Sequence, residues 1–208
     1  ALGFVLGLLV AIVRTITLPE KKRGVSGVGL TIRRGLLAFV QLLTNIYIQV
    51  FRGTPMIVQA VVIYYGAQYA GIFMDTTFAA IFIISINTGA YMAEIIRGGI
   101  MAVDEGQNEA GRSLGLNFAQ TMLYIIIPQA LKNVLPALAN EFIALLKETS
   151  VAGYVAVQDL TKGGDIIRSR TYSPFLPLIA VALIYLVLVM FFSWLVSKLE
   201  RRLRNSDH

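Results

Sequence analysis

The sequence predicts an all-α polytopic membrane protein, an inference drawn from its composition and from the pattern of its apolar runs. Of its 208 residues, 56% are hydrophobic and only 14% are charged, whereas a soluble domain carries about a quarter charged residues. Several apolar runs approach the roughly 20 residues that cross a bilayer core. We therefore predict five transmembrane helices in a single domain, residues 1–208. Basic residues lie in the loops beside these runs, so the net charge of +6 does not indicate nucleic-acid binding.

The first predicted span is the apolar run 1–18, which begins without Met. Its uncharged part ends before Arg14 and falls short of the roughly 20 residues that a span requires, so we expect the helix to be truncated at its start. Gly3, Gly7 and Ala11 recur every fourth residue. Small residues at this spacing allow membrane helices to approach closely.

A dense basic loop follows at 19–24, and such loops stay in the cytoplasm. The next segment, 30–51, is apolar but carries Gln41, Asn45 and Gln49 at every fourth position. These amides share one helical face, which favours an amphipathic helix on the membrane surface over a span.

The second predicted span runs over 56–73 and follows the string FRGTP, residues 51–55. Thr54 before Pro55 is a good helix start, with the threonine as cap and the proline in the first turn. Arg52 is expected to extend its side chain to the cytoplasmic interface.

The third predicted span, 77–96, carries polar side chains on one face. They are Asn87, Tyr91 and Glu94, at positions i, i+4 and i+7. Polar groups at membrane depth are costly and normally face a cavity or a partner helix. We predict that they line a substrate pathway together with Thr88. For Glu94 the alternative is a structural ion pair with Arg97, one turn on.

The segment at about 98–127 is the only long water-exposed stretch in the middle of the chain. Its polar residues punctuate short apolar pairs, and Gly111 and Gly115 are predicted to break it. Two short amphipathic helices joined near Gly115 fit this pattern. The second would start at Asn117, a good cap, and end at Pro128.

The same segment contains four anchors at fixed spacing. They are Glu109-Ala110, Gly115, Ile125-x-Ile127 and Pro128. This pattern resembles the EAA loop of permease subunits in ATP-driven bacterial importers, with Gly111 in place of the second Ala and Ile127 in place of Leu. The string FRGTP followed by Val58-Gln59 is also similar to the polar amino-acid permeases of that family (the histidine/glutamine/arginine permeases). The alternative for the stretch is a solvated loop between two membrane helices.

This resemblance implies a type I ABC importer-like fold, in which the EAA loop is a coupling helix that docks on a separate ATPase. The residues that it assigns to docking are Glu109, Ala110, Gly111, Arg112, Leu114 and Gly115. The other implied partners are a second permease subunit, identical or different, and an extracytoplasmic amino-acid-binding protein. No GxxxxGK[ST] string occurs in the sequence, so ATP and Mg are expected on the partner ATPase, with no cofactor in this chain.

The fourth predicted span, after Pro128, is the least hydrophobic, and Pro128 and Pro136 are expected to break it into pieces. Beyond it we assign three further pathway residues, opposite the face of the third span. They are Ser150, Gln158 and Asp159. A cationic substrate would pair with Asp159 or Glu94, which favours basic amino acids, with glutamine close behind. The alternative for Gln158 and Asp159 is a solvated outer loop, which is predicted to continue over 162–172.

The last predicted span, 174–196, is almost wholly apolar and is followed by a basic tail, 198–204. With five spans, the distribution of basic residues places the amino end outside a bacterial plasma membrane and the carboxyl end in the cytoplasm. The EAA segment then lies in the cytoplasm, where an ATPase can reach it.

Taken together, these features predict the transmembrane subunit of an importer that moves polar amino acids by alternating access. The chain has no Cys and one terminal His, which leaves no metal site, and no catalytic arrangement of side chains indicates an enzyme. One alternative is a self-sufficient ion-coupled carrier or channel that uses Glu94, Glu141 or Asp159. Another is a membrane scaffold that anchors an ATPase.

Overall fold

The computed structural model describes residues 1–16, 28–155 and 157–205, and all regular elements in these residues are helical. The predicted basic loop 19–24 lies outside them. The elements are α1 (Leu2–Thr15), α2 (Val28–Gly53), α3 (Met56–Tyr69), α4 (Thr76–Met101), α5 (Glu105–Ser113), α6 (Phe118–Thr121), the π-helical η1 (Met122–Ile126), α7 (Ile127–Glu148), the 3₁₀-helical η2 (Thr149–Val155), α8 (Leu160–Thr171) and α9 (Leu176–Asn205).

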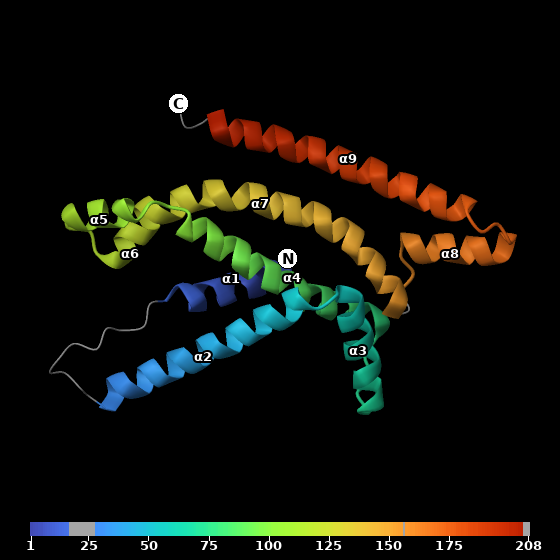
Figure 1. Ribbon diagram of the computed structural model, residues 1–208, viewed down its shortest axis with the longest axis horizontal. Helices are drawn as coiled ribbons and strands as arrows, with labels where there is room; N and C mark the ends of the chain where they lie inside the picture. The colour runs from blue at the N-terminus through green and yellow to red at the C-terminus, as the bar shows by residue number, and fades with distance from the viewer. Residues whose placement is uncertain (17–27, 156, 206–208) are drawn as a thin grey trace.

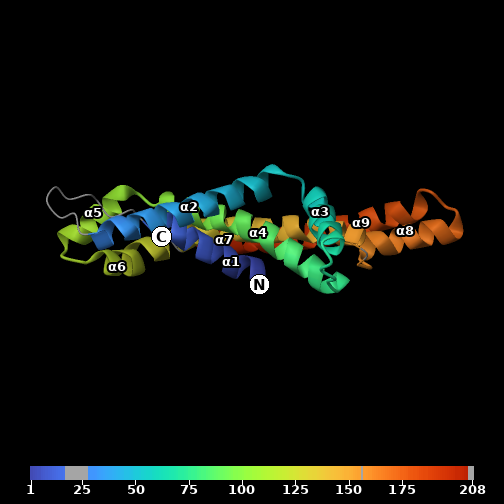
Figure 2. The same ribbon diagram turned by 90° about the horizontal axis from the view of Figure 1, so that it is seen from below.

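The molecule is elongated, with α5 and α6 at one end and α8 at the other (Figure 1, Figure 2). Within the described residues, four helices are long and apolar enough to cross a membrane, and α1 is a shorter apolar helix. The four are 29–53, 76–101, 118–155 and 176–202. The predicted fold class, a helical protein with about five spans, is therefore confirmed.

The second span is formed by α2 and not by the segment that the sequence indicated. Residues 30–51, which we predicted on the membrane surface, belong to a helix long and apolar enough to cross. The predicted span 56–73 is instead α3, which has 14 residues, ends at Tyr69 and lies across the long axis (Figure 1). The polar face of α2 indicated a helix on the membrane surface, but part of this face contacts another helix. Gln41 donates its amide N–H to the backbone oxygens of Val13 and Ile16 at the end of α1.

The glycine ladder of α1 packs against α4. A Cβ at Gly3 would lie 2.8 Å from Cβ of Thr88, and one at Gly7 would collide with Cβ of Met92. Because Gly3 meets Thr88 and Gly7 meets Met92, the two helices run parallel. Ala11 continues the row and is fully buried. The close approach that the spacing predicted is confirmed, and α4 is its partner.

The fourth span, 118–155, is one continuous helix that passes through both prolines without a break. Pro128 lies in the first turn of α7 and Pro136 lies within it. The predicted breaks are therefore wrong. The π turn of η1 comes immediately before Pro128 and shifts the hydrogen-bond pattern by one residue. It thereby avoids the backbone bond that proline cannot make.

The last two helices complete the bundle. Stretch 160–171 forms α8 where an outer loop was predicted, because the side chain of Asp159 caps its first turn. α9 returns along α7, with the rings of Phe142 and Phe192 in edge contact at 5.5 Å between centroids. Most of α9 is exposed, as expected of a peripheral, lipid-facing helix.

Candidate functional site

The α5 end of the molecule forms a sharp elbow, residues 104–121, which we call the coupling elbow. Asp104 caps α5 by accepting a hydrogen bond from the backbone N–H of Gly106 at 2.7 Å. Gly115 then turns the chain with a φ of +82°, a left-handed conformation that glycine adopts without a Cβ clash. The two short helices and the turn agree with the sequence prediction.

The second helix of the elbow starts at Asn117, as predicted. Asn117 and Gln120 form a reciprocal capping box, in which each side-chain oxygen accepts a backbone N–H from the other residue, at 3.0 and 2.9 Å. The predicted end at Pro128 is wrong, because the helix continues into α7. One helical column therefore joins the elbow to the interior of the bundle.

We had predicted that Gly111 breaks the first helix. This is wrong, because Gly111 is buried within α5. A Cβ at this position would lie 2.7 Å from Cγ2 of Thr121 and 3.1 Å from Cδ1 of Ile125. The absence of a side chain therefore lets α5 lie directly on α6 and η1. A second contact joins α5 to α7, where the Gln129 amide donates to Oε1 of Gln107 at 3.2 Å.

The remaining predicted docking residues face outward. These are Glu109, Ala110, Arg112, Leu114 and Gly115, all exposed. The side chain of Leu114 is 78% exposed, and the nearby Phe118 is 64% exposed. We had not assigned Phe118 to the docking surface. The signal that could have indicated it is a large apolar residue immediately after a helix cap in a polar segment.

The polar face of α4 begins with a buried amide pair. Asn87 is 2% exposed and donates to Oε1 of Gln59 at 2.8 Å. Gln59 in turn donates to the backbone oxygens of Phe51 and Thr54, both at 2.9 Å. The two amides therefore hold the bend between α2 and α3. Thr54 does not cap α3, because its hydroxyl donates back to the oxygen of Val50 in α2.

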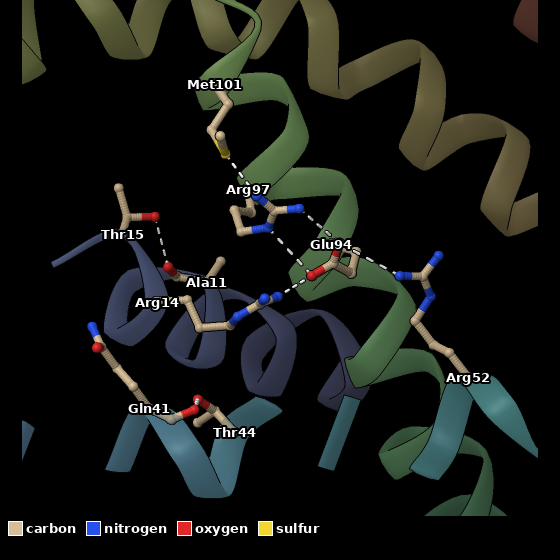
Figure 3. A network of polar contacts seen from close by, with 9 residues as sticks. All are labelled: Ala11, Arg14, Thr15, Gln41, Thr44, Arg52, Glu94, Arg97 and Met101. Atoms are coloured by element: carbon tan, nitrogen blue, oxygen red, sulfur yellow. Dashed lines mark hydrogen bonds and ion pairs between the residues drawn. The ribbon is translucent and has the colours of Figure 1, made fainter. Parts of the chain in front are cut away.

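Further along α4, Glu94 lies among three arginines from three helices (Figure 3). Arg97 donates to its two oxygens at 3.3 and 3.0 Å, from Nε and Nη2. Arg14 of α1 donates to Oε1, and Nη1 of Arg52 lies 3.4 Å from Oε2. The structural alternative for Glu94, a pair with Arg97, is therefore present, and two further partners join it.

We had expected Arg52 to extend its side chain to the cytoplasmic interface, but it makes two contacts within the bundle. Its guanidinium lies 5.4 Å from the centre of the Tyr91 ring, a cation–π contact, in addition to its ion pair with Glu94. Arg14 and Arg52 approach the carboxylate from opposite sides (Figure 3). No local sequence pattern indicated either pair, because both residues are distant from Glu94 along the chain.

The second predicted group of pathway residues lies at the α8 end. Ser150 borders a polar cavity of about 340 Å3 beside Lys162, Asp165 and Arg168. Oδ1 of Asp159 accepts the backbone N–H of Lys162 at 2.8 Å. Its buried Oδ2 has no partner among the described residues. Gln158 is exposed.

The two predicted groups remain apart in this conformation. Between described residues, no hydrogen bond or ion pair joins the second group to the polar face of α4. Thr88, the remaining member of that face, is buried against Gly3 of α1. A common pathway therefore stays a prediction.

The sequence matches the family described as "binding-protein-dependent transport system inner membrane component" over residues 26–205. It is 38% identical over 166 residues to the arginine transport system permease protein ArtQ of Bacillus subtilis, covering 79% of this chain and 76% of the relative. It is also 42% identical over 167 residues to the probable glutamine ABC transporter permease protein GlnM of the same species, covering 80% and 77%. The glutamine transport system permease protein GlnP of Escherichia coli is 38% identical over 161 residues, covering 76% and 74%.

Solved structures have the same architecture. A chain in a crystal structure of an amino acid ABC transporter with histidines superposes with a TM-score of 0.84 at 43% identity, covering 97% of this chain and 85% of that chain. A chain of the methionine ABC transporter MetNI in an inward-facing conformation gives a TM-score of 0.70 at 20% identity, covering 97% and 88%. The second likeness concerns the fold alone.

Proposed function

This chain belongs to the family of binding-protein-dependent transport system inner membrane components, and we propose that it is the transmembrane subunit of an ATP-driven importer for polar amino acids. The relatives named for arginine and glutamine transport support this substrate class. They do not favour the alternative of a self-sufficient ion-coupled carrier. The substrate moves by alternating access, driven by a separate ATPase.

The coupling elbow is the observation that carries this proposal. It presents Glu109, Arg112 and Leu114 at one end of the molecule, outside the packed bundle. It is also continuous with the column 118–155, which ends beside α8 (Figure 1). A partner that binds the elbow would therefore move this column, which we propose to be part of the pathway. ATP and Mg bind to that partner, because this sequence has no P-loop.

The distribution of charge supports an orientation in a bacterial plasma membrane with the amino end outside and the carboxyl end in the cytoplasm. α1 and α9 both run toward the α5 end (Figure 1). Arg14 lies in the last turn of α1, and Lys198, Arg201 and Arg202 lie in the last turns of α9. Basic residues collect on the cytoplasmic side of membrane proteins. An extracytoplasmic binding protein would then deliver substrate at the α8 end, and a second permease subunit would complete the pathway.

Of the two predicted groups of pathway residues, we propose that the one at the α8 end contacts the substrate. Three arginines already surround Glu94, so its carboxylate is not free to pair with a cationic substrate. Asp159 has one buried oxygen without a partner among the described residues. We therefore assign the cationic group of a basic amino acid to Asp159 and the amide of glutamine to the same region.

Reconstitution into lipid vesicles tests the function. The permease with its ATPase and binding protein is expected to take up radiolabelled arginine or glutamine only when ATP is supplied. Uptake by this chain alone, driven by an ion gradient, would establish the carrier instead. Absence of uptake under both conditions would leave only the scaffold.

Replacement of Glu109 by Gln tests the docking role. We expect ATP-driven uptake to fall at least tenfold while the protein inserts and melts normally, because the side chain of Glu109 is exposed and forms no hydrogen bond or ion pair with the described residues. Glu105→Gln, the same change at an exposed acid one turn earlier in α5 and outside the predicted docking residues, is the control and should transport normally. Normal coupling in Glu109→Gln would contradict the role.

A further inference from the structure

A polar cavity of about 320 Å3 lies between the end of α1, the middle of α2 and the end of α4. The residues that line it are Arg14, Thr15, Gln41, Asn45, Arg97 and Met101. It lies on the Arg14 side of Glu94, away from Arg52 (Figure 3). It is therefore separate from the contact of Arg52 with Tyr91 and from the coupling elbow.

The cavity carries an excess of positive charge. Arg14 and Arg97 line the cavity and share the carboxylate of Glu94, so these three side chains have a formal charge of two minus one, or +1. Among the described residues no other acid contacts these guanidinium groups. Partly buried cations without enough counter-charge are costly, which makes the cavity a favourable place for an anion.

Several donors in the cavity are also unfilled. A guanidinium has five N–H donors, but the only hydrogen bond of Arg14 within the described residues is the one from Nη1 to Glu94. Arg97 donates hydrogen bonds from Nε and Nη2 to Glu94. Its Nη1 donates only to the sulfur of Met101, which is a weak acceptor. An anion with several oxygens, such as a phosphate, matches these donors.

The position of the cavity suits the headgroup of a lipid. Arg97 is one helical turn before the end of α4, and Arg14 is in the last turn of α1. Both therefore lie near the end of the apolar part of the bundle. Basic pockets between membrane helices at this depth recognise anionic headgroups.

An apolar groove of about 440 Å3 lies on the other flank of α1, between α1, α4 and the α6–α7 column. Its lining includes Leu8 and Ile12 of α1, Ile100 of α4 and Leu131 of α7. Thr15 borders both the groove and the polar cavity. A cationic cavity beside an apolar groove matches a ligand that has a charged head and a hydrocarbon chain.

We propose that the polar cavity holds the phosphate of an anionic phospholipid and that the adjoining groove holds one of its acyl chains. The phosphate bridges Arg14 of α1 and Arg97 of α4 and reduces the charge excess around Glu94. In the orientation proposed above, this lipid comes from the cytoplasmic leaflet. Only that choice of leaflet rests on the proposed function, because binding in detergent does not depend on orientation or transport.

A titration of the purified permease–ATPase complex in detergent tests the site, with the melting temperature and native mass spectrometry as readouts. The probes are dioctanoyl phosphatidylglycerol, dioctanoyl phosphatidylcholine, glycerol 1-phosphate and inorganic phosphate. We expect phosphatidylglycerol to bind about tenfold more tightly than phosphatidylcholine, because two arginines attract its net charge. Equal binding of the two lipids would overturn the proposal. Soluble phosphate that binds as tightly as phosphatidylglycerol would replace the lipid with a free anion.

Asn45→Leu fills the cavity without removing a charge or any contact of the ion cluster. We expect it to weaken phosphatidylglycerol binding about tenfold, with the melting temperature of the lipid-free complex unchanged. Gln49→Leu, one turn further along α2 and outside the cavity, is the matched control and should bind normally. Undiminished binding in a folded Asn45→Leu complex, or an equal loss in Gln49→Leu, would overturn the location of the site.

Discussion

In the middle of the bundle, α1 and α4 approach so closely that Gly7 leaves no space for a methyl group, and Glu94 joins side chains from three helices. At the α5 end, by contrast, the coupling elbow is held by contacts within one stretch of the chain. They are the capping box of Asn117 and Gln120, the packing of Gly111 on Thr121, and the hydrogen bond between Gln107 and Gln129. Contacts in the middle connect helices that are distant in the chain. We therefore expect changes there to alter the stability of the whole bundle, and changes at the elbow to alter coupling with stability largely retained.

The largest effect is expected from Gly7→Ala in α1. The added Cβ would collide with Cβ of Met92 and lie 2.9 Å from the backbone oxygen of Gly89, so the helices must separate. We expect the free energy of unfolding to fall by about 3 kcal/mol, measured as a lower melting temperature of the purified protein. Gly98→Ala in α4 is the control, because a Cβ there would have no atom of the described residues within 4 Å. Equal melting temperatures for the two variants would contradict the close contact.

Glu94→Gln comes next, because it leaves Arg14, Arg52 and Arg97 without their shared carboxylate. We expect a loss of about 2 kcal/mol in the free energy of unfolding, the usual range for hydrogen bonds to charged groups. Asp165→Asn in α8 removes a pair with Arg168 at 2.6 Å whose side chains are both well exposed. That control is expected to cost less than about 1 kcal/mol. Thermal melts of the two variants, compared under the same salt, give the difference.

Gly111→Leu separates stability from docking within the elbow. The new side chain would meet Thr121 and Ile125, and we expect a loss of about 1 kcal/mol as α5 is displaced from α6 and η1. Ala110→Leu, its exposed neighbour, should melt normally and lose ATP-driven uptake instead. The comparison requires melting temperature and uptake on the same preparations. If Ala110→Leu melted lower than Gly111→Leu, the assignment of buried and exposed faces would be wrong.

Gly115→Trp is expected to affect transport more than stability. No described residue lies within 4 Å of a Cβ at Gly115, so its cost arises from the φ of +82°, about 1 to 2 kcal/mol. We expect ATP hydrolysis without uptake, because the bulky side chain would hinder docking of the elbow. Gly115→Asn is the conservative variant, since asparagine tolerates this conformation. Normal transport by Gly115→Trp would contradict the docking role.

Features that depend on neighbouring residues could be predicted from the sequence, whereas contacts between separate helices could not. The cap at Asn117 and the turn at Gly115 depend on neighbouring residues, and both were predicted correctly. The partners Arg14 and Arg52 of Glu94 were not, because ion pairs between separate helices leave no spacing signal. Similarly, the amides of α2 indicated a surface helix, because nothing in that segment showed that Gln41 would meet the end of α1.

Two local signals also failed, each for a packing reason. Gly111 was predicted to break α5, yet a helix tolerates glycine where another helix lies against it. Pro128 was predicted to end a helix, yet the π turn before it accommodates the ring. In both cases the residue was recognised as one that can interrupt a helix, but its actual role depended on surrounding structure that the sequence does not identify.

The uninterrupted column from Phe118 to Val155 can work as a lever. Gly99 of α4 presses against Val134 part-way along it, which provides a fulcrum. At 1.5 Å per residue, the arm from Phe118 to Val134 is about 24 Å long, so a swing of about ten degrees would carry the elbow through about 4 Å and tilt the far arm in the opposite direction. A short movement of the elbow would thus produce a movement in the opposite direction at the other end of the column.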